Sequence, residues 1–178
     1  VKPLELDAAG IMVPHVMSAN DARTVARNVR FHPLGRRAID GGNRDGAYCN
    51  MEFREYLQFV NHNRFVIAQI EDIEALAELD EICAVPGIDI IFFGPGDFSQ
   101  SIGRPGEFDH PAIAAARRQV ASAARRAGKF AGTVGGPGNA AELIAEGFRF
   151  INLGSDVIGL GSYCRELLEQ TNSNLAKE

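Results

Sequence analysis

The sequence has few cysteines, and none is spaced for a disulfide framework or a metal site. Cys49, Cys83 and Cys164 are odd in number, far apart and outside any C-x-x-C arrangement, which argues against a disulfide scaffold and against zinc. The chain also lacks the run of about 20 apolar residues that a membrane helix needs, and residues 1–10 lack the pattern of a signal peptide. We therefore expect reduced thiols in a soluble, cytoplasmic protein without a membrane partner.

Runs of positive charge are missing as well. Lysine and arginine total 18 against 23 aspartates and glutamates, the net charge is -5, and basic residues adjoin one another only in pairs. This balance argues against nucleic acid as a partner and leaves small metabolites as ligands. With 46% hydrophobic residues, the chain of 178 residues is long enough for one well-packed domain, which we expect to span residues 1–178.

One unit recurs along the chain: a short apolar run, a Gly or an acid at its end, and then a helical pattern. The runs are continuous rather than alternating in hydrophobicity, which is typical of parallel strands covered on both faces. Strand and helix in alternation predict an α/β fold with a parallel sheet. The five predicted strands are 10–16, 64–70, 88–94, 129–135 and 149–154.

Start and stop signals place the intervening helices. Ser18 precedes a helical pattern at 19–29, Pro111 opens another that ends before Gly128, and Asn139 precedes a third. The one long connection, 32–62, is rich in glycine and charge in its first half. It is either a lid or intersubunit arm, or a surface excursion that ends in a short helix.

Two architectures fit this order, a doubly wound sheet and a (β/α)8 TIM barrel, and both place ligands at the carboxyl ends of the strands. A barrel takes roughly 250 residues, so this chain would supply about the last five of eight units. An open sheet of five strands would leave its first strand as an apolar edge, which another chain or further strands would have to cover.

Two acids follow neighbouring predicted strands. Glu71 ends "AQIED" and Asp97 ends "FGPGD", so both are expected at the same rim, where adjacent strands lie about 4.8 Å apart. Carboxylates that close need a countercharge, and ligation by oxygen atoms suits Mg2+ or Mn2+. Gln69 points to the same side as Glu71, and Gly94 and Gly96 allow a ligand to approach the backbone. The alternative is that Asp97 caps a helix and Glu71 is solvated.

Other chemistries find less support. Imine catalysis needs a lysine at the carboxyl end of a strand, but Lys2 and Lys177 are near the termini and Lys129 opens its strand. The Gly-rich segments 133–139 and 153–156 are placed where barrels often bind phosphate, so a phosphate-binding isomerase is a second possibility. That possibility leaves the two acids without a role.

The motifs "GIMVPHV", "HPLGRR", "AQIED", "FFGPGDFSQSIG" and "FRFINLGSD" occur in this order, and with them the chain resembles the HpcH/HpaI aldolase family over most of its length. The resemblance implies a TIM barrel and a homo-oligomer, commonly a hexamer, with the last helix, at 157–170 in the C-terminal segment 157–178, exchanged between subunits. It also implies that Glu71 and Asp97 bind Mg2+ or Mn2+, that Gln69 contacts pyruvate, and that the backbone at Gly96 and Asp97 holds the pyruvate carboxylate.

The implied reaction is cleavage of a 4-hydroxy-2-oxo acid to pyruvate and an aldehyde. The family's catalytic His and Arg align upstream of Val1, and Glu5 aligns with the acid that assists this His. An inactive partial barrel that only binds metal and 2-oxo acid is therefore a further alternative. His15 is the histidine nearest the end of a predicted strand, so it either lines the site or packs beside the core, and we expect the second. We expect the other histidines, His32, His62 and His110, to lie in loops or caps at the surface.

Overall fold

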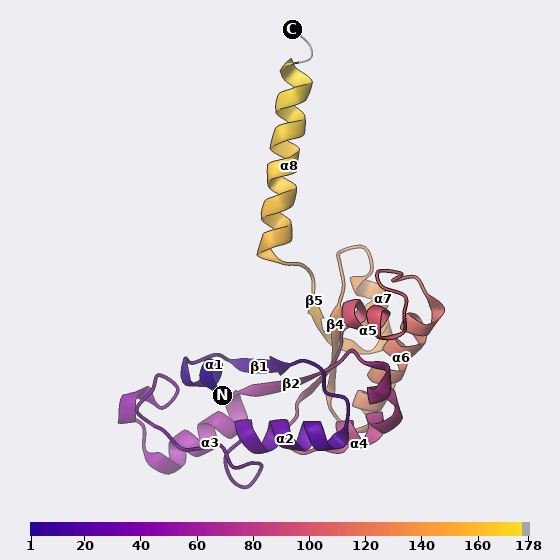
Figure 1. Ribbon diagram of the computed structural model, residues 1–178. Helices are drawn as coiled ribbons and strands as arrows, with labels where there is room; N and C mark the ends of the chain where they lie inside the picture. Colours follow the sequence, from indigo (N-terminus) through magenta and orange to yellow (C-terminus); the bar gives the residue numbers. More distant parts are fainter. Residues whose placement is uncertain (176–178) are drawn as a thin grey trace.

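The computed structural model describes residues 1–175 and contains one sheet of five parallel strands (Figure 1). The strands are ordered as in the sequence, which confirms the predicted parallel sheet. Their bounds are β1 (Gly10–Val13), β2 (Phe65–Ile70), β3 (Ile90–Phe93), β4 (Phe130–Val134) and β5 (Phe148–Asn152).

The strands are somewhat shorter than the apolar runs that predict them. The run at 10–16 forms a strand only to Val13, because Pro14 has no N–H to donate and His15 adopts a left-handed φ of 53°. The side chains after Val13 therefore no longer alternate between the two faces of the sheet. The chain therefore turns at the carboxyl end of β1, next to the end of β2.

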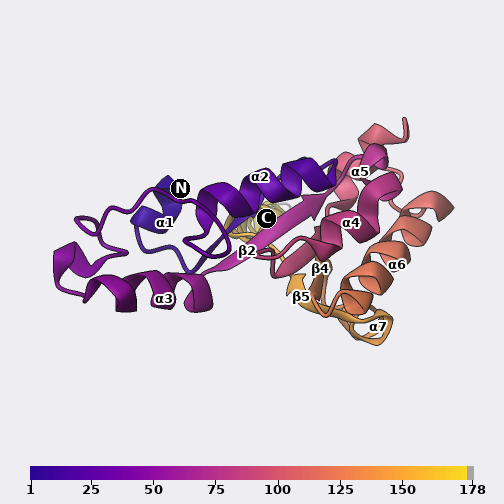
Figure 2. The ribbon, with the colours of Figure 1, turned by 90° about the horizontal axis from the view of Figure 1, so that it is seen from below.

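Helices follow the strands and pack mainly on one face of the sheet. Ser18 begins α2 as predicted, accepting a hydrogen bond from the Asp21 N–H at 3.1 Å. Figure 2 shows α2, α4 and α6 in sequence along this face, and apolar side chains from these helices form the main core with β2, β3 and β4. The helices are α1 (Lys2–Glu5), α2 (Ala19–Val29), α3 (Phe53–Asn63), α4 (Leu79–Ala84), α5 (Pro95–Ser101), α6 (Pro111–Arg126), α7 (Ala140–Glu146) and α8 (Asp156–Leu175), with 3-10 turns η1 (Ala47–Cys49) and η2 (Ile73–Glu78).

The opposite face of the sheet is also apolar. Phe92 and Phe150 pack edge to face with ring centroids 6.2 Å apart, in a second cluster with Ile67, Ile90 and Phe65. Farther along β4, the same face presents Phe130 and Val134, which are 61% and 46% exposed. The sheet is therefore hydrophobic on both faces, as the continuous apolar runs predict.

Helix α8 extends away from the rest of the molecule (Figure 1). It covers the predicted helix at 157–170, and none of its described residues is buried. Residues 176–178 of the predicted C-terminal segment, including Lys177, lie outside the described residues. Among the helices of residues 1–175, none combines the length and hydrophobicity required to cross a bilayer.

A network of arginines joins the segments at the end where the strands begin. The buried Arg30 donates to the carbonyl oxygens of Asn61 at 3.1 Å, Arg64 at 2.6 Å and Gly87 at 2.9 Å, and it forms an ion pair with Asp89. These bonds connect the end of α2 to the segments that lead into β2 and β3.

The long connection 32–62 lies at this same end. Its Asp45 is buried, pairs with Arg37 at 3.0 Å and accepts a hydrogen bond from Arg64 at 2.9 Å, just before β2 begins. The prediction of a lid over the carboxyl ends of the strands is therefore wrong, because buried ion pairs hold the segment at the opposite end. The segment ends in α3, as the surface-excursion alternative predicts.

Candidate functional site

The pairing register of β2 with β3 brings the ends of these strands together. Gln69 pairs with Phe92 and Ile70 with Phe93, and the Gly94 N–H donates to the Ile70 carbonyl oxygen at 3.0 Å. Glu71 is thus next to Gly94, three residues before Asp97 in the first turn of α5. The two acids that the spacing singles out follow neighbouring strands at one rim of the sheet.

Glu71 is only 1% exposed, although it is an acid at the end of a strand. Its Oε1 accepts a hydrogen bond from the His15 backbone N–H at 2.9 Å, and its Oε2 accepts one from the Gln69 side-chain amide. These donors fix both carboxylate oxygens. The alternative that Glu71 is a solvated acid is wrong, because neighbouring strands enclose it.

Gly94 leaves room for this arrangement. A Cβ atom at this position would lie 2.8 Å from both the Gln69 Nε2 and the Glu71 Oε2. Any side chain here would therefore displace the amide or the carboxylate. At Gly96 a Cβ would meet nothing within 4 Å, so the fold itself does not require glycine there.

His15 lies at the rim, and the prediction that it packs beside the core is wrong. Its side chain is 57% exposed, with Nδ1 3.0 Å from Asp72 Oδ2 and 3.6 Å from Glu71 Oε1. The hydrogen bond with Asp72, followed by the charge of Glu71, raises the pKa of His15 above its ordinary value. Sequence reasoning missed this pair; the available signal was a histidine two residues after one strand and an acid two residues after the next.

Asp97 is exposed and does not cap α5, because the capping position belongs to Gly94. The first bond of the helix runs from the Phe98 N–H to the Gly94 carbonyl oxygen at 3.1 Å. Pro95 has no N–H, so the backbone N–H groups of Gly96 and Asp97 are the first-turn donors without an intrahelical acceptor. They belong to the same first turn of α5 as Asp97.

The donor set at this rim consists of oxygen ligands. Within residues 1–175, no three His, Cys, Asp or Glu side chains are gathered in a geometry for a metal ion. Glu71 and Asp97 alone fit a hard cation such as Mg2+, which is commonly held by one or two carboxylates and completes its shell with water and substrate oxygens. Among residues 1–175, the basic side chain within 4.0 Å of the buried Glu71 carboxylate is the exposed His15, so a bound cation would add a countercharge there.

Glu5 lies elsewhere. It belongs to α1, which precedes β1, and it lines a cavity of about 510 Å³ together with Arg44 and Tyr48 at the end where the strands begin. Within one chain the fold does not bring Glu5 to Glu71, so its role in assisting a histidine stays a prediction. His32 is exposed outside any helix or strand and His110 caps α6, as predicted. His62 is exposed but lies in the last turn of α3, so the prediction of a loop or cap position is wrong for it.

The Gly-rich segment after β4 lines a cavity of about 340 Å³ with Thr133, Asn139 and Arg117. A phosphate bound in this cavity would need a positively charged side chain, and Arg117 is the one that lines it. Its Nη2 already donates to Glu146 at 2.9 Å and to Glu142 at 3.0 Å. Since two carboxylates neutralise it, this cavity gives the phosphate-binding alternative little support.

A family model and curated relatives match this chain over most of its length. Residues 1–160 match the family model described as HpcH/HpaI aldolase/citrate lyase. The chain is 34% identical to 2-dehydro-3,6-dideoxy-6-sulfogluconate aldolase of Pseudomonas putida over 99% of this chain and 69% of that protein. It is 33% identical to the hydroxypyruvate/pyruvate aldolase of Paraburkholderia phytofirmans over 96% of this chain and 66% of the relative.

Solved structures agree in fold. The crystal structure of an HpcH/HpaI aldolase/citrate lyase family protein from Burkholderia cenocepacia superposes with a TM-score of 0.85 at 32% identity, covering 96% of this chain and 68% of that one. Other curated relatives are matched over 56% to 58% of their length. The chain thus spans between half and about two thirds of the proteins that it resembles.

Proposed function

The chain belongs to the HpcH/HpaI aldolase/citrate lyase family, and from this membership and the rim at Glu71 we propose that it forms the metal-binding and 2-oxo-acid-binding part of an aldolase site. The reaction would be cleavage of a 4-hydroxy-2-oxo acid to pyruvate and an aldehyde. The observation that carries the proposal is the buried Glu71 carboxylate, fixed by Gln69 and His15 beside the first turn of α5. The curated relatives named as aldolases support the reaction class.

Glu71 and Asp97 would hold Mg2+ or Mn2+. When bound, the cation would act as a Lewis acid toward the 2-oxo group and stabilise the negative charge that develops during C–C cleavage. The backbone N–H groups of Gly96 and Asp97 would bind the substrate carboxylate at the start of α5. Gln69 would orient the substrate with its amide, which in the protein alone donates to Glu71.

We also propose that the five strands are part of a (β/α)8 barrel, in one domain over residues 1–178. The apolar face that bears Phe92, Phe150 and the exposed Phe130 supports this, because a closed barrel covers such a face with further strands. The exposed helix α8 supports assembly into a homo-oligomer, in which this helix would pack against a second copy.

Binding of oxalate, a planar mimic of the pyruvate enolate, tests the proposed function. Calorimetry should detect oxalate binding with Mn2+ present and none with EDTA. Gln69→Ala should weaken oxalate binding by about tenfold, the loss of one hydrogen bond to a charged group. Gln58→Ala, an exposed position on α3, is the matched control. Oxalate binding that ignores Mn2+, or inorganic phosphate binding without metal, would contradict the proposal.

A further inference from the structure

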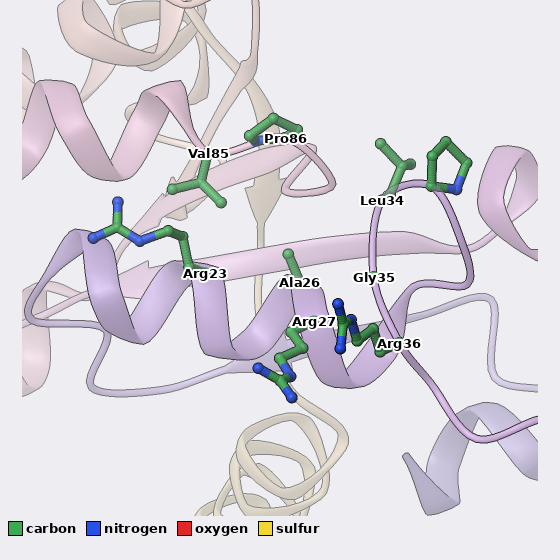
Figure 3. A pocket seen from close by; sticks show the side chains of 9 residues that line it. Arg23, Ala26, Arg27, Leu34, Gly35, Arg36, Val85 and Pro86 are labelled. Atoms are coloured by element: carbon green, nitrogen blue, oxygen red, sulfur yellow. The ribbon is translucent and has the colours of Figure 1, made fainter.

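A third cavity, of about 440 Å³, lies at the end of the sheet where the strands begin, away from Glu71. It is formed between α2, the segment 33–36 and the segment 85–86 that precedes β3 (Figure 3). Figure 3 shows Ala26 pointing from α2 toward Leu34 and Pro86, so small and apolar side chains make up the interior. The volume is within the usual range of small-molecule sites.

The wall opposite the helix is held in place. The Arg36 N–H donates to the Arg27 carbonyl oxygen at 2.6 Å, and the N–H groups of Leu34 and Gly35 both reach the Phe31 carbonyl oxygen at 3.0 Å. A Cβ at position 35 would lie 2.4 Å from the Arg30 carbonyl oxygen, so only glycine permits this close approach. The cavity is therefore a preformed feature of the fold.

Three arginines surround this cavity: Arg23, Arg27 and Arg36. Arg23 and Arg27 are one turn apart on α2, and Arg36 is joined to Arg27 by the backbone hydrogen bond described above. Within residues 1–175, none of the three has a carboxylate oxygen within the 4.0 Å of an ion pair. The chain carries a net charge of -5, so this is a local concentration of positive charge on an acidic protein.

Two acids of neighbouring elements are engaged with other arginines. Asp89 pairs with Arg30, the buried arginine at the end of the same helix, and Asp80 of α4 pairs with Arg126 of α6. Within residues 1–175, Arg30 and Arg126 thus have carboxylate partners, whereas the three guanidinium groups around the cavity have none. A multivalent anion would supply that charge, and planar guanidinium groups match phosphate oxygens in bidentate geometry.

We propose that this cavity binds an organic phosphate, with the phosphate groups on Arg23, Arg27 and Arg36. The organic part of the ligand would lie on the apolar surface of Pro33, Leu34, Val85 and Pro86. Because the cavity is at the opposite end of the strands from Glu71, its ligand acts at a separate site. The proposal does not depend on the aldolase activity.

The test is calorimetric titration of the whole chain with ADP, pyrophosphate and adenosine, all in EDTA so that no metal contributes. ADP should bind, pyrophosphate more weakly, and adenosine not measurably. Arg27→Gln and Arg36→Gln should each weaken ADP by at least about tenfold, the usual loss for a charge-assisted hydrogen bond. Both side chains are exposed, so these variants should fold, which circular dichroism verifies.

Two controls make the result specific. Arg118→Gln removes an exposed arginine from α6 with the same change in net charge, and Glu71→Gln alters the other end of the sheet; both should leave ADP affinity within about twofold. Absence of ADP binding at millimolar concentration would overturn the proposal. Equal weakening by Arg118→Gln, or unchanged binding in the Arg27 and Arg36 variants, would overturn it as well.

Discussion

Gly94 is the residue on which the geometry of the rim most directly depends. Gly94→Ala places a methyl group 2.8 Å from the Gln69 and Glu71 side chains. We expect a loss of about 1–3 kcal/mol in the free energy of unfolding, as for overpacked sites, together with weaker Mn2+ binding because the carboxylate moves. Urea denaturation and Mn2+ titration measure the two effects.

Gly96→Ala is the matched control in the same turn. A Cβ there meets nothing within 4 Å, and alanine suits a helix better than glycine, so stability should stay unchanged or rise by up to about 1 kcal/mol. If both variants are equally stable, the crowding at Gly94 is not the constraint that we describe.

Burial distinguishes one cysteine from the others. Cys83 is fully buried, and desolvation, with the charge of Asp80 next, raises the pKa of its thiol to about 11. At about pH 8 it should therefore remain a protonated, shielded thiol, whereas the exposed Cys49 reacts with Ellman's reagent within minutes. Counting the thiols that react before and after denaturation measures how many are shielded in the native protein. The variant Cys49→Ser identifies which thiol reacts fast. Rapid reaction of Cys83 in the native protein would contradict it.

The sequence predicted the position of some residues at this rim and not of others. Glu71 and Asp97 are identifiable because each follows an apolar run, and parallel strands end at one rim. His15 was misplaced because its position depends on a left-handed φ after Pro14 and on pairing with a strand more than fifty residues away. Neither feature leaves a local pattern in the sequence.

At the scale of elements, strands were predicted more reliably than the segments between them. All five apolar runs form strands, since burial on both faces demands continuous hydrophobicity. Helix α5 was anticipated only in the alternative that Asp97 caps a helix, because seven residues are too few for an apolar period. The connection 32–62 was ambiguous, because its position depends on the buried pair of Arg37 and Asp45.

Helix α8 carries an apolar stripe that no other part of residues 1–175 buries. The stripe consists of exposed residues at helical spacing: Val157, Leu160, Cys164, Leu167 and Leu168. If a second copy covers it, Leu160→Glu should convert the oligomer to monomers, because a charge would be buried in the interface. Sedimentation velocity measures the change in mass.

Ser173→Glu adds the same charge on the opposite side of α8 and should leave the oligomer intact. Cys164 offers a second readout, since it should react slowly with Ellman's reagent in the oligomer and rapidly in Leu160→Glu. A native protein that sediments as a monomer would contradict this role of α8.

At the scale of the whole molecule, the chain is a curved parallel sheet with helices on one face, an apolar second face and a helix that projects away. The two candidate sites lie at opposite ends of its strands. The carboxyl ends bring acids together, and the starting ends bring arginines together. The sequence predicted the first arrangement from the order of its motifs, whereas the arginine cavity depends on the fold of the segment 33–36 against α2.

The central claim is that Glu71 and Asp97 hold one divalent cation at this rim. Electron paramagnetic resonance of Mn2+ titrated into the protein measures it most directly. The native chain should bind one Mn2+ with micromolar to millimolar affinity, Glu71→Gln and Asp97→Asn should each abolish this binding, and Glu74→Gln, an exposed acid nearby, should retain it. Unchanged Mn2+ affinity in the Glu71 and Asp97 variants would contradict the account.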